Sequence, residues 1–175
     1  AFDEVAISPL QRCRETIDPW LTSTGAKSRI VVDDSISEVD YGNWSGKTLA
    51  SLRRKAQWKV VQDFPSQMTF PDGESLLEMQ GRALSGFYRL NAVKGKGPRL
   101  LVSHGDVIKA IVANALGMHL DDFQRIVIDP ASVTILDYSH GTARLTLLND
   151  TRSQLTELLT GPKRTKNLLG GGSGK

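Results

Sequence analysis

The chain has 175 residues, of which 39% are hydrophobic and 23% charged, a composition that excludes a disordered chain and fits one domain better than two. The formal charge of +3 does not indicate a nucleic-acid surface: the last fifteen positions hold four basic residues and no acidic one, and 18 basic against 19 acidic residues remain without them. A lone Cys13 excludes a disulfide framework, and no apolar run is long enough to cross a bilayer. We therefore expect a cytoplasmic protein with no nucleic-acid or membrane partner.

The first half of the chain predicts two strands, each followed by helical or loop sequence. A strand is expected over 2–8 and a helix over 9–25, with Pro9 in its first turn and Pro19 expected to shorten or bend it. A second short strand follows at 29–33. The irregular loop 34–48 and a helix from about 48 to 61 complete this half.

The second half begins with a loop at 64–73 and a helix over 74–93, whose expected apolar face contains Leu77, Ala83, Leu84, Phe87 and Leu90. Strand 99–103 leads into helix 105–117, which Gly117 closes. A short helix at 119–126 and two alternating strands, 131–138 and 142–149, follow. The last strands are joined at a turn that contains His140.

Short, nearly all-apolar strands that alternate with helices are typical of a parallel sheet covered on both faces. The sequence thus predicts an α/β fold, a three-layer α/β/α sandwich with a mainly parallel sheet and the final hairpin as its antiparallel edge. We expect residues 1–150 to form this domain and residues 151–175 to form a basic, Gly-rich tail.

Two junctions between a strand and a helix carry residues suited to binding an anion. ISPLQRCRETI supplies Arg12 and Arg14, and LVSHGDVIKAI supplies His104, with Gly105 allowing close backbone approach. Arginines, an imidazole and helix N-termini together favour a phosphate or another oxyanion. Taken singly, either junction is also compatible with a packed turn.

The remaining polar candidates are less distinctive. His140 is expected in a hairpin turn and His119 on the surface. Glu38, in the glycine-punctuated loop ISEVDYGNWSG, is either solvated or a general acid toward a leaving oxygen, with Tyr41 and Trp44 packed beneath it. The stretch GNWSGKT is not a phosphate-binding P-loop, because it has three residues between its glycines instead of four and no strand precedes it. No cluster shows metal-ligand spacing.

Four segments in chain order resemble elements of the histidine phosphatase superfamily, also called phosphoglycerate mutase-like. SPLQRCRET resembles its S-P-L-x-R-A-x-x-T element and SEVDYGNWSG its E-x-x-x-G-x-W-E-G loop. FPDGES resembles its P-G-G-E-S element and LLVSHGDVIKA its V-S-H-G-G-V-I-R element. Four ordered matches are far more specific than any one of them.

The resemblance implies a metal-independent reaction, with no cofactor, in which a histidine attacks the phosphoryl group and forms a phosphohistidine. By motif, Arg12 is a clamp arginine, Glu38 the proton donor and His104 the second, non-nucleophilic histidine. Ser8 and Gly105 are implied to shape the substrate pocket. Arg14 is off the matched position, and we expect it on the surface.

The chain departs from the family at the nucleophile, because the family's R-H-G element at the end of its first strand does not occur in these residues. We interpret the chain as a fragment of a longer enzyme that lacks this strand and is itself inactive. A smaller departure is Asp106, which stands for a glycine and places a carboxylate beside the anion pocket. We expect it to disfavour heavily charged substrates.

The predicted function is that of a phosphomonoesterase acting on a small-molecule phosphomonoester. Two alternatives remain from the sequence. One is a phosphoglycerate mutase, and the other is a non-catalytic pseudo-phosphatase in which Arg12 and His104 still hold a phosphate.

Overall fold

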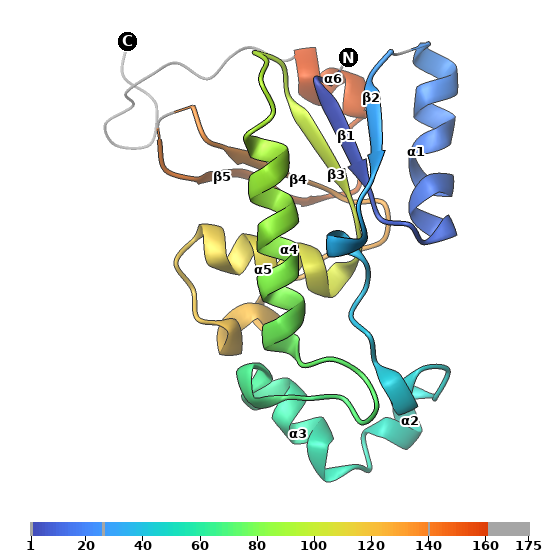
Figure 1. Cartoon of the computed structure of the whole chain (residues 1–175), viewed down its shortest axis with the longest axis vertical. Helices are drawn as coiled ribbons and strands as arrows, with labels where there is room; N and C mark the ends of the chain where they lie inside the picture. Colours follow the sequence, from blue (N-terminus) through green and yellow to red (C-terminus); the bar gives the residue numbers. More distant parts are fainter. Residues whose placement is uncertain (1, 26, 140, 161–175) are drawn as a thin grey trace.

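A computed structural model describes residues 2–25, 27–139 and 141–160 (Figure 1). The strands are β1 (Glu4–Ile7), β2 (Arg29–Val32), β3 (Arg99–Val102), β4 (Val133–Asp137) and β5 (Arg144–Asp150). The α-helices are α1 (Gln11–Thr24), α2 (Leu49–Leu52), α3 (Ala56–Asp63), α4 (Leu76–Asn91), α5 (Gly105–Ala115) and α6 (Leu155–Thr160). Short 3-10 turns are η1 (Asp34–Ile36), η2 (Gly42–Trp44), η3 (Pro65–Gln67) and η4 (Leu120–Arg125).

The parallel sheet has the strand order β2-β1-β3 and is covered on both faces. Because successive side chains in a strand point to opposite faces, Val5 and Ile7 pack with α1 and α6, whereas Ala6 packs with α4 and α5. Leu101 of β3 joins the same cluster as Ala6. The predicted three-layer α/β sandwich is confirmed, and Figure 1 shows α1 and α4 on opposite sides of the strands.

The final hairpin does not extend the parallel sheet in the described part of the chain. Strands β4 and β5 pair antiparallel with each other in a separate two-stranded sheet. Among the described strands β3 pairs only with β1, and a cavity of about 570 Å³ is lined by residues 100–103 of β3 and its end together with residues 128–133. The strands expected to form the antiparallel edge are therefore present as a hairpin, but they do not pair with β3. The cavity lined by both β3 and residues 128–133 is called the groove below.

The first predicted helix is confirmed and is not shortened at Pro19, whereas the prediction of one helix over about 48–61 is wrong. Helix α1 continues through Pro19 and ends before Gly25, which adopts φ +59°. The segment expected as one helix is divided into α2 and α3, because Lys55 is extended with ψ 142°. The break lets Leu52 be buried while Trp58 stacks against Trp44, at 6.4 Å between ring centroids.

The predicted apolar face of α4 is confirmed except at Leu77, because Ala83 and Leu90 are buried and Leu84 and Phe87 pack against the core. Its capping box, Ser75 with Glu78, starts the helix, and its buried residues are Leu76, Met79, Ala83, Gly86 and Leu90. Leu77 is 56% exposed, although we expected it on the apolar face. The predicted helix at 119–126 is the 3-10 turn η4, which buries Leu120 and Phe123.

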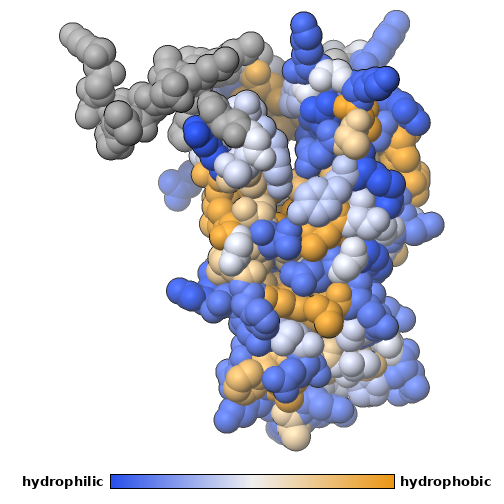
Figure 2. All heavy atoms as spheres, turned by 60° about the vertical axis from the view of Figure 1, so that its left-hand side comes forward, coloured by the Kyte–Doolittle hydropathy of each residue, from blue (hydrophilic) through white to orange (hydrophobic). Residues whose placement is uncertain are grey.

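The segment assigned to the tail begins with an ordered helix. Leu155 and Leu159 of α6 pack on the cluster that contains Phe2 and Ile17, while residues 161–175 and His140 lie outside the described residues. No described helix is long and apolar enough to cross a membrane. Figure 2 shows one face of the molecule, on which apolar residues emerge in patches between polar ones.

Candidate active site

The predicted site residues meet where the parallel strands end. Ser8 directly follows β1, and Arg12 lies in the first turn of α1. Glu38 lies in the loop after β2, just beyond η1. His104 follows β3 as the N-cap of α5, and Gly105 is the first residue of that helix. Because parallel strands end at one edge of the sheet, residues far apart in sequence become neighbours.

His104 is buried, and both of its ring nitrogens have partners. Arg12 Nε donates to Nδ1 at 3.2 Å, and Ser8 Oγ lies 2.7 Å from Nε2. A guanidinium can only donate, so Nδ1 is the acceptor and a neutral ring carries its proton on Nε2, which then donates to Ser8. The Cys13 thiol lies 3.5 Å from the same Nε2. These contacts fix both the tautomer and the orientation of the ring.

The surroundings keep His104 neutral. Burial lowers its pKa, and the positive charges of Arg12 and Arg82 lower it further, to about 4. Its Nδ1 lies 3.9 Å from Glu38 Oε2, but an ion pair would require a protonated ring. At neutral pH the imidazole is therefore a hydrogen-bonding group and not a cation.

Glu38 has the opposite shift. Burial raises its pKa, and the negative charge of Asp106 adds to this effect, giving about 7. Arg12 Nη2 is 4.0 Å from Glu38 Oε2 and opposes the rise, but the Arg12 side chain is 59% exposed, so water weakens its attraction. A carboxyl group with a pKa near 7 can give or take a proton at neutral pH, as a general acid must.

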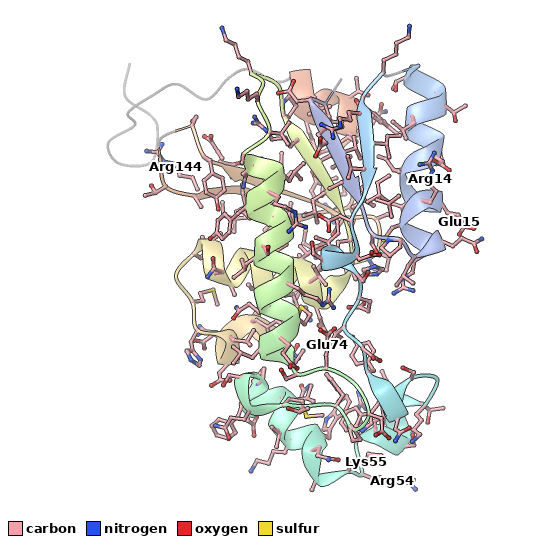
Figure 3. All side chains as sticks on the ribbon, in the orientation of Figure 1. Arg14, Glu15, Arg54, Lys55, Glu74 and Arg144 are labelled. Atoms are coloured by element: carbon pink, nitrogen blue, oxygen red, sulfur yellow. The ribbon has the colours of Figure 1, made fainter. Side chains whose placement is uncertain are left out.

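A partly buried network that sequence reasoning missed holds the loop of Glu38. Arg82 Nη1 donates to the carbonyls of Ser35 and Ser37 at 2.9 and 2.8 Å, and its Nη2 donates to the carbonyl of Glu38 at 3.1 Å. Arg82 also pairs with Glu74, which lies beside the N-terminal end of α4 in Figure 3. The sequence feature that could have indicated this ion pair is the spacing of eight residues between Glu74, in the P-D-G-E-S segment, and Arg82.

A second unpredicted contact joins the same loop to α5. The Tyr41 hydroxyl donates to Asp106 Oδ2 at 2.9 Å, and Asp106 Oδ1 lies 3.5 Å from Lys109 Nζ. Tyr41 also packs edge-on against Phe70, at 5.1 Å between ring centroids. The sequence predicted Trp44 and Tyr41 beneath the loop. Trp44 is buried, whereas Tyr41 is half-buried and reaches Asp106.

Other candidates lie away from this cluster. Arg14 pairs with Asp18 at 2.6 Å on the outer surface of α1, where Figure 3 labels it. His119 is 68% exposed and caps η4. Among the described residues, His104 is thus the one histidine at the site, and no group of three or more metal-ligating side chains is found there. A methyl group on Gly105 would meet no atom of the described residues within 4 Å, so packing against these residues does not require a glycine at this position.

Comparison with known proteins shows the family of the chain. Residues 1–151 match the histidine phosphatase superfamily (branch 1), and the chain belongs to this superfamily. It is similar to "Bifunctional protein Rv2228c" of Mycobacterium tuberculosis, with 32% identity over 154 residues, which cover 84% of this chain and 40% of that protein. It is also similar to phosphoserine phosphatase 1 of Hydrogenobacter thermophilus, with 26% identity over 77% of this chain and 64% of that protein. The chain thus spans less than two thirds of these relatives.

Solved structures show the same fold. The Mycobacterium tuberculosis protein of open reading frame Rv3214 superposes with a TM-score of 0.68 and 26% identity, covering 85% of this chain and 72% of that one. Mycobacterial glucosyl-3-phosphoglycerate phosphatase Rv2419c, whose complex with inorganic phosphate has been solved, gives a TM-score of 0.69 and 25% identity over 83% of this chain and 75% of that one.

Proposed function

We propose that this chain belongs to a metal-independent phosphomonoesterase that acts on small phosphomonoesters through a phosphohistidine. The observation that carries the proposal is the junction of Arg12, Glu38 and His104, in which a cation, a carboxyl group with a pKa near 7 and a neutral imidazole meet. The relatives that bear phosphatase names support the same reaction class.

Each residue has a distinct task in this reaction. Arg12 donates hydrogen bonds to phosphoryl oxygens and stabilises their negative charge, and His104, whose Nδ1 accepts from Arg12 Nε, holds that arginine in place. A histidine nitrogen attacks phosphorus, an N–P bond forms, and the P–O bond to the leaving group breaks while Glu38 gives its proton to the leaving oxygen. Water then attacks phosphorus, Glu38 takes a proton from that water, and the N–P bond breaks to release phosphate.

His104 is poorly suited to be the nucleophile, because its Nδ1 accepts from Arg12 and its Nε2 faces Ser8. We assign the attack to a second histidine, on the strand with Arg-His-Gly that the family resemblance implies. The groove along the free edge of β3 supports this assignment, because an unpaired strand edge presents N–H and C=O groups to a further strand. Two residues that line the groove, Trp20 and Ser132, also have buried polar atoms without hydrogen-bond partners.

Phosphatase assays on this chain and on a version extended at its N-terminus test the proposal. We expect activity only with the extension, together with an acid-labile phosphoprotein trapped during turnover. His104→Ala in the active protein should lower turnover by orders of magnitude; a loss under about tenfold would show that His104 is only a turn residue. Activity of the short chain itself would overturn the assignment of the nucleophile.

A mutase is the second candidate, because the chain is also 28% identical, over 148 residues, to the 2,3-bisphosphoglycerate-dependent phosphoglycerate mutase of Cytophaga hutchinsonii. A mutase returns the phosphoryl group to a sugar acid, whereas a phosphatase releases it to water. Release of inorganic phosphate without formation of a phosphoglycerate isomer would support the phosphatase. A folded, phosphate-binding protein that is inactive even when extended would instead indicate a non-catalytic phosphate-binding module.

A further inference from the structure

We propose that Asp106, held by Tyr41 and Lys109, determines the substrate specificity of the proposed phosphatase site. Its carboxylate favours phosphomonoesters with a neutral or cationic organic group over those whose organic group carries a negative charge of its own. The inference rests on the proposed function, and it names a substrate class for that site.

The carboxylate of Asp106 is held at both oxygens. Oδ2 accepts from the Tyr41 hydroxyl and Oδ1 lies beside Lys109 Nζ, and the side chains of Asp106 and Lys109 are only 21% and 18% exposed. Asp106 cannot turn into solvent without losing both contacts. It is also the second residue of α5, directly after Gly105 and two positions after His104, so its charge is fixed close in the chain to the candidate anion site and acts on Glu38.

The negative charge of Asp106 reaches the place where the leaving group must lie. Tyr41 follows Glu38 by three residues in the same loop, so the Tyr41 hydroxyl joins that loop to Asp106. After burial, the charge of Asp106 is the largest cause of the raised pKa of Glu38. Because Glu38 gives its proton to the leaving oxygen, the organic group attached to that oxygen lies near Glu38. It is therefore exposed to the same negative potential of Asp106.

The neighbouring cations do not cancel the negative potential of Asp106 near the loop that carries Glu38 and Tyr41. Lys109 Nζ also lies 3.2 Å from Gln124 Oε1 and 5.7 Å from the centre of the Phe123 ring, which holds the ammonium group toward η4. Arg12, 4.0 Å from Glu38, and Arg82, bound to the carbonyl of Glu38, each lower the pKa of Glu38 by less than Asp106 raises it. On the loop side Asp106 meets a neutral hydroxyl, since burial and the charges of Asp106 and Glu38 raise the pKa of Tyr41.

An isosteric pair of substrates tests this inference in the natural full-length polypeptide. 4-Carbamoylphenyl phosphate and 4-carboxyphenyl phosphate have the same shape and differ in one negative charge. We expect the parent protein to favour the carbamoyl ester in kcat/KM by about tenfold, and Asp106→Asn to remove most of this preference, mainly by lowering KM for the carboxy ester. Lys109→Gln should widen the preference, because it leaves the carboxylate of Asp106 unopposed.

Matched controls separate the possible outcomes. Asp18→Asn removes one carboxylate from an exposed ion pair of α1 and should leave the preference unchanged. If the protein hydrolyses the esters but neither Asp106→Asn nor Lys109→Gln changes the preference, the inference is overturned and the proposed function stands. If it hydrolyses neither ester nor 4-nitrophenyl phosphate, the proposed function is overturned, and this inference falls with it.

Discussion

Arg12 Nε donates to His104 Nδ1 at 3.2 Å, across 92 residues of sequence. The contact joins the first turn of α1 to the N-cap of α5, and it places a permanent cation against the accepting nitrogen of the imidazole. Protonation of His104 would turn this hydrogen bond into a contact between two cations. The same arginine that would bind a phosphoryl group therefore also keeps the neighbouring histidine neutral.

The first prediction is a loss of stability in acid that depends on His104. The folded-state pKa of about 4 lies below the ordinary value of 6.5, so the unfolded chain takes up a proton that the folded chain refuses. His104 should then contribute a fall of as much as about 3 kcal/mol in the free energy of unfolding as the pH decreases from about 6.5 to about 4, whereas Glu38, whose folded-state pKa is raised, contributes a rise over the same range.

Urea unfolding at pH 7 and pH 4.5 measures this effect. His104→Gln has no group to protonate at this position, so its free energy of unfolding at pH 4.5, relative to its own value at pH 7, should be higher than in the parent. His119→Gln, on a side chain that is 68% exposed, controls for the loss of a histidine elsewhere. An NMR titration that placed the pKa of His104 near 6.5 would contradict the prediction.

The second prediction concerns the pH dependence of the reaction. Glu38 must be protonated to act as an acid, and its pKa of about 7 is raised by burial and by the charge of Asp106. With an alkyl phosphate as substrate, kcat/KM should therefore fall as the pH rises above about 7. Asp106→Asn removes the charge that favours the protonated form, so this fall should move to lower pH. A profile unchanged by Asp106→Asn would argue that another group sets the alkaline limb.

The third prediction separates proton donation by Glu38 from substrate binding. Glu38→Gln should lower kcat/KM for an alkyl phosphate by about 10² to 10⁴, because an alkoxide is a poor leaving group without a proton. The loss should be much smaller for 4-nitrophenyl phosphate, whose leaving group needs little protonation. Asp40→Asn, in the same loop but exposed, serves as the control. Equal losses with both esters would mean that Glu38 acts in binding.

The sequence was sufficient for the site residues that follow strands. Ser8, Arg12 and His104 could be predicted as neighbours, because strand–helix junctions of a parallel sheet meet at one edge. Glu38 could be assigned only through the family resemblance, since a carboxylate in a loop has no periodic signal. Its contact distances to Arg12 and His104 could not be derived from the pattern.

The contacts that tune the site were beyond sequence reasoning. The bond between Tyr41 and Asp106 joins residues 65 positions apart, and Arg82 reaches the Glu38 carbonyl from 44 positions away. Pairings of this kind depend on how α4 and α5 pack, which a single sequence does not specify. The groove beside β3 was missed for a similar reason, because the hairpin pattern does not reveal which strand it pairs with.

The fourth prediction is that Arg82 positions Glu38. Arg82 and Glu74 are mostly buried, with side chains 26% and 19% exposed, and Arg82 satisfies three loop carbonyls as well as the Glu74 carboxylate. Arg82→Met leaves these acceptors without a donor, so we expect it to lower the free energy of unfolding by about 2 to 4 kcal/mol.

Arg89 of the same helix provides the matched control. It binds Asp33 through both carboxylate oxygens, but its side chain is 57% exposed. Arg89→Met should therefore cost less than about 1 kcal/mol in the same urea titration and leave kcat unchanged.

A purely structural role of Arg82 would lower stability without changing the chemistry of the protein that remains folded. A positioning role predicts more, because a loop released from Arg82 moves Glu38 away from the leaving oxygen. The alkaline limb set by Glu38 should then weaken in Arg82→Met, and kcat should fall more for alkyl phosphates than for 4-nitrophenyl phosphate. Arg82→Lys can satisfy fewer of the carbonyls and should restore only part of both effects. If Arg82→Met lost stability but kept the parent pH profile and ester preference, Arg82 would stabilise the fold without positioning Glu38 as the proton donor.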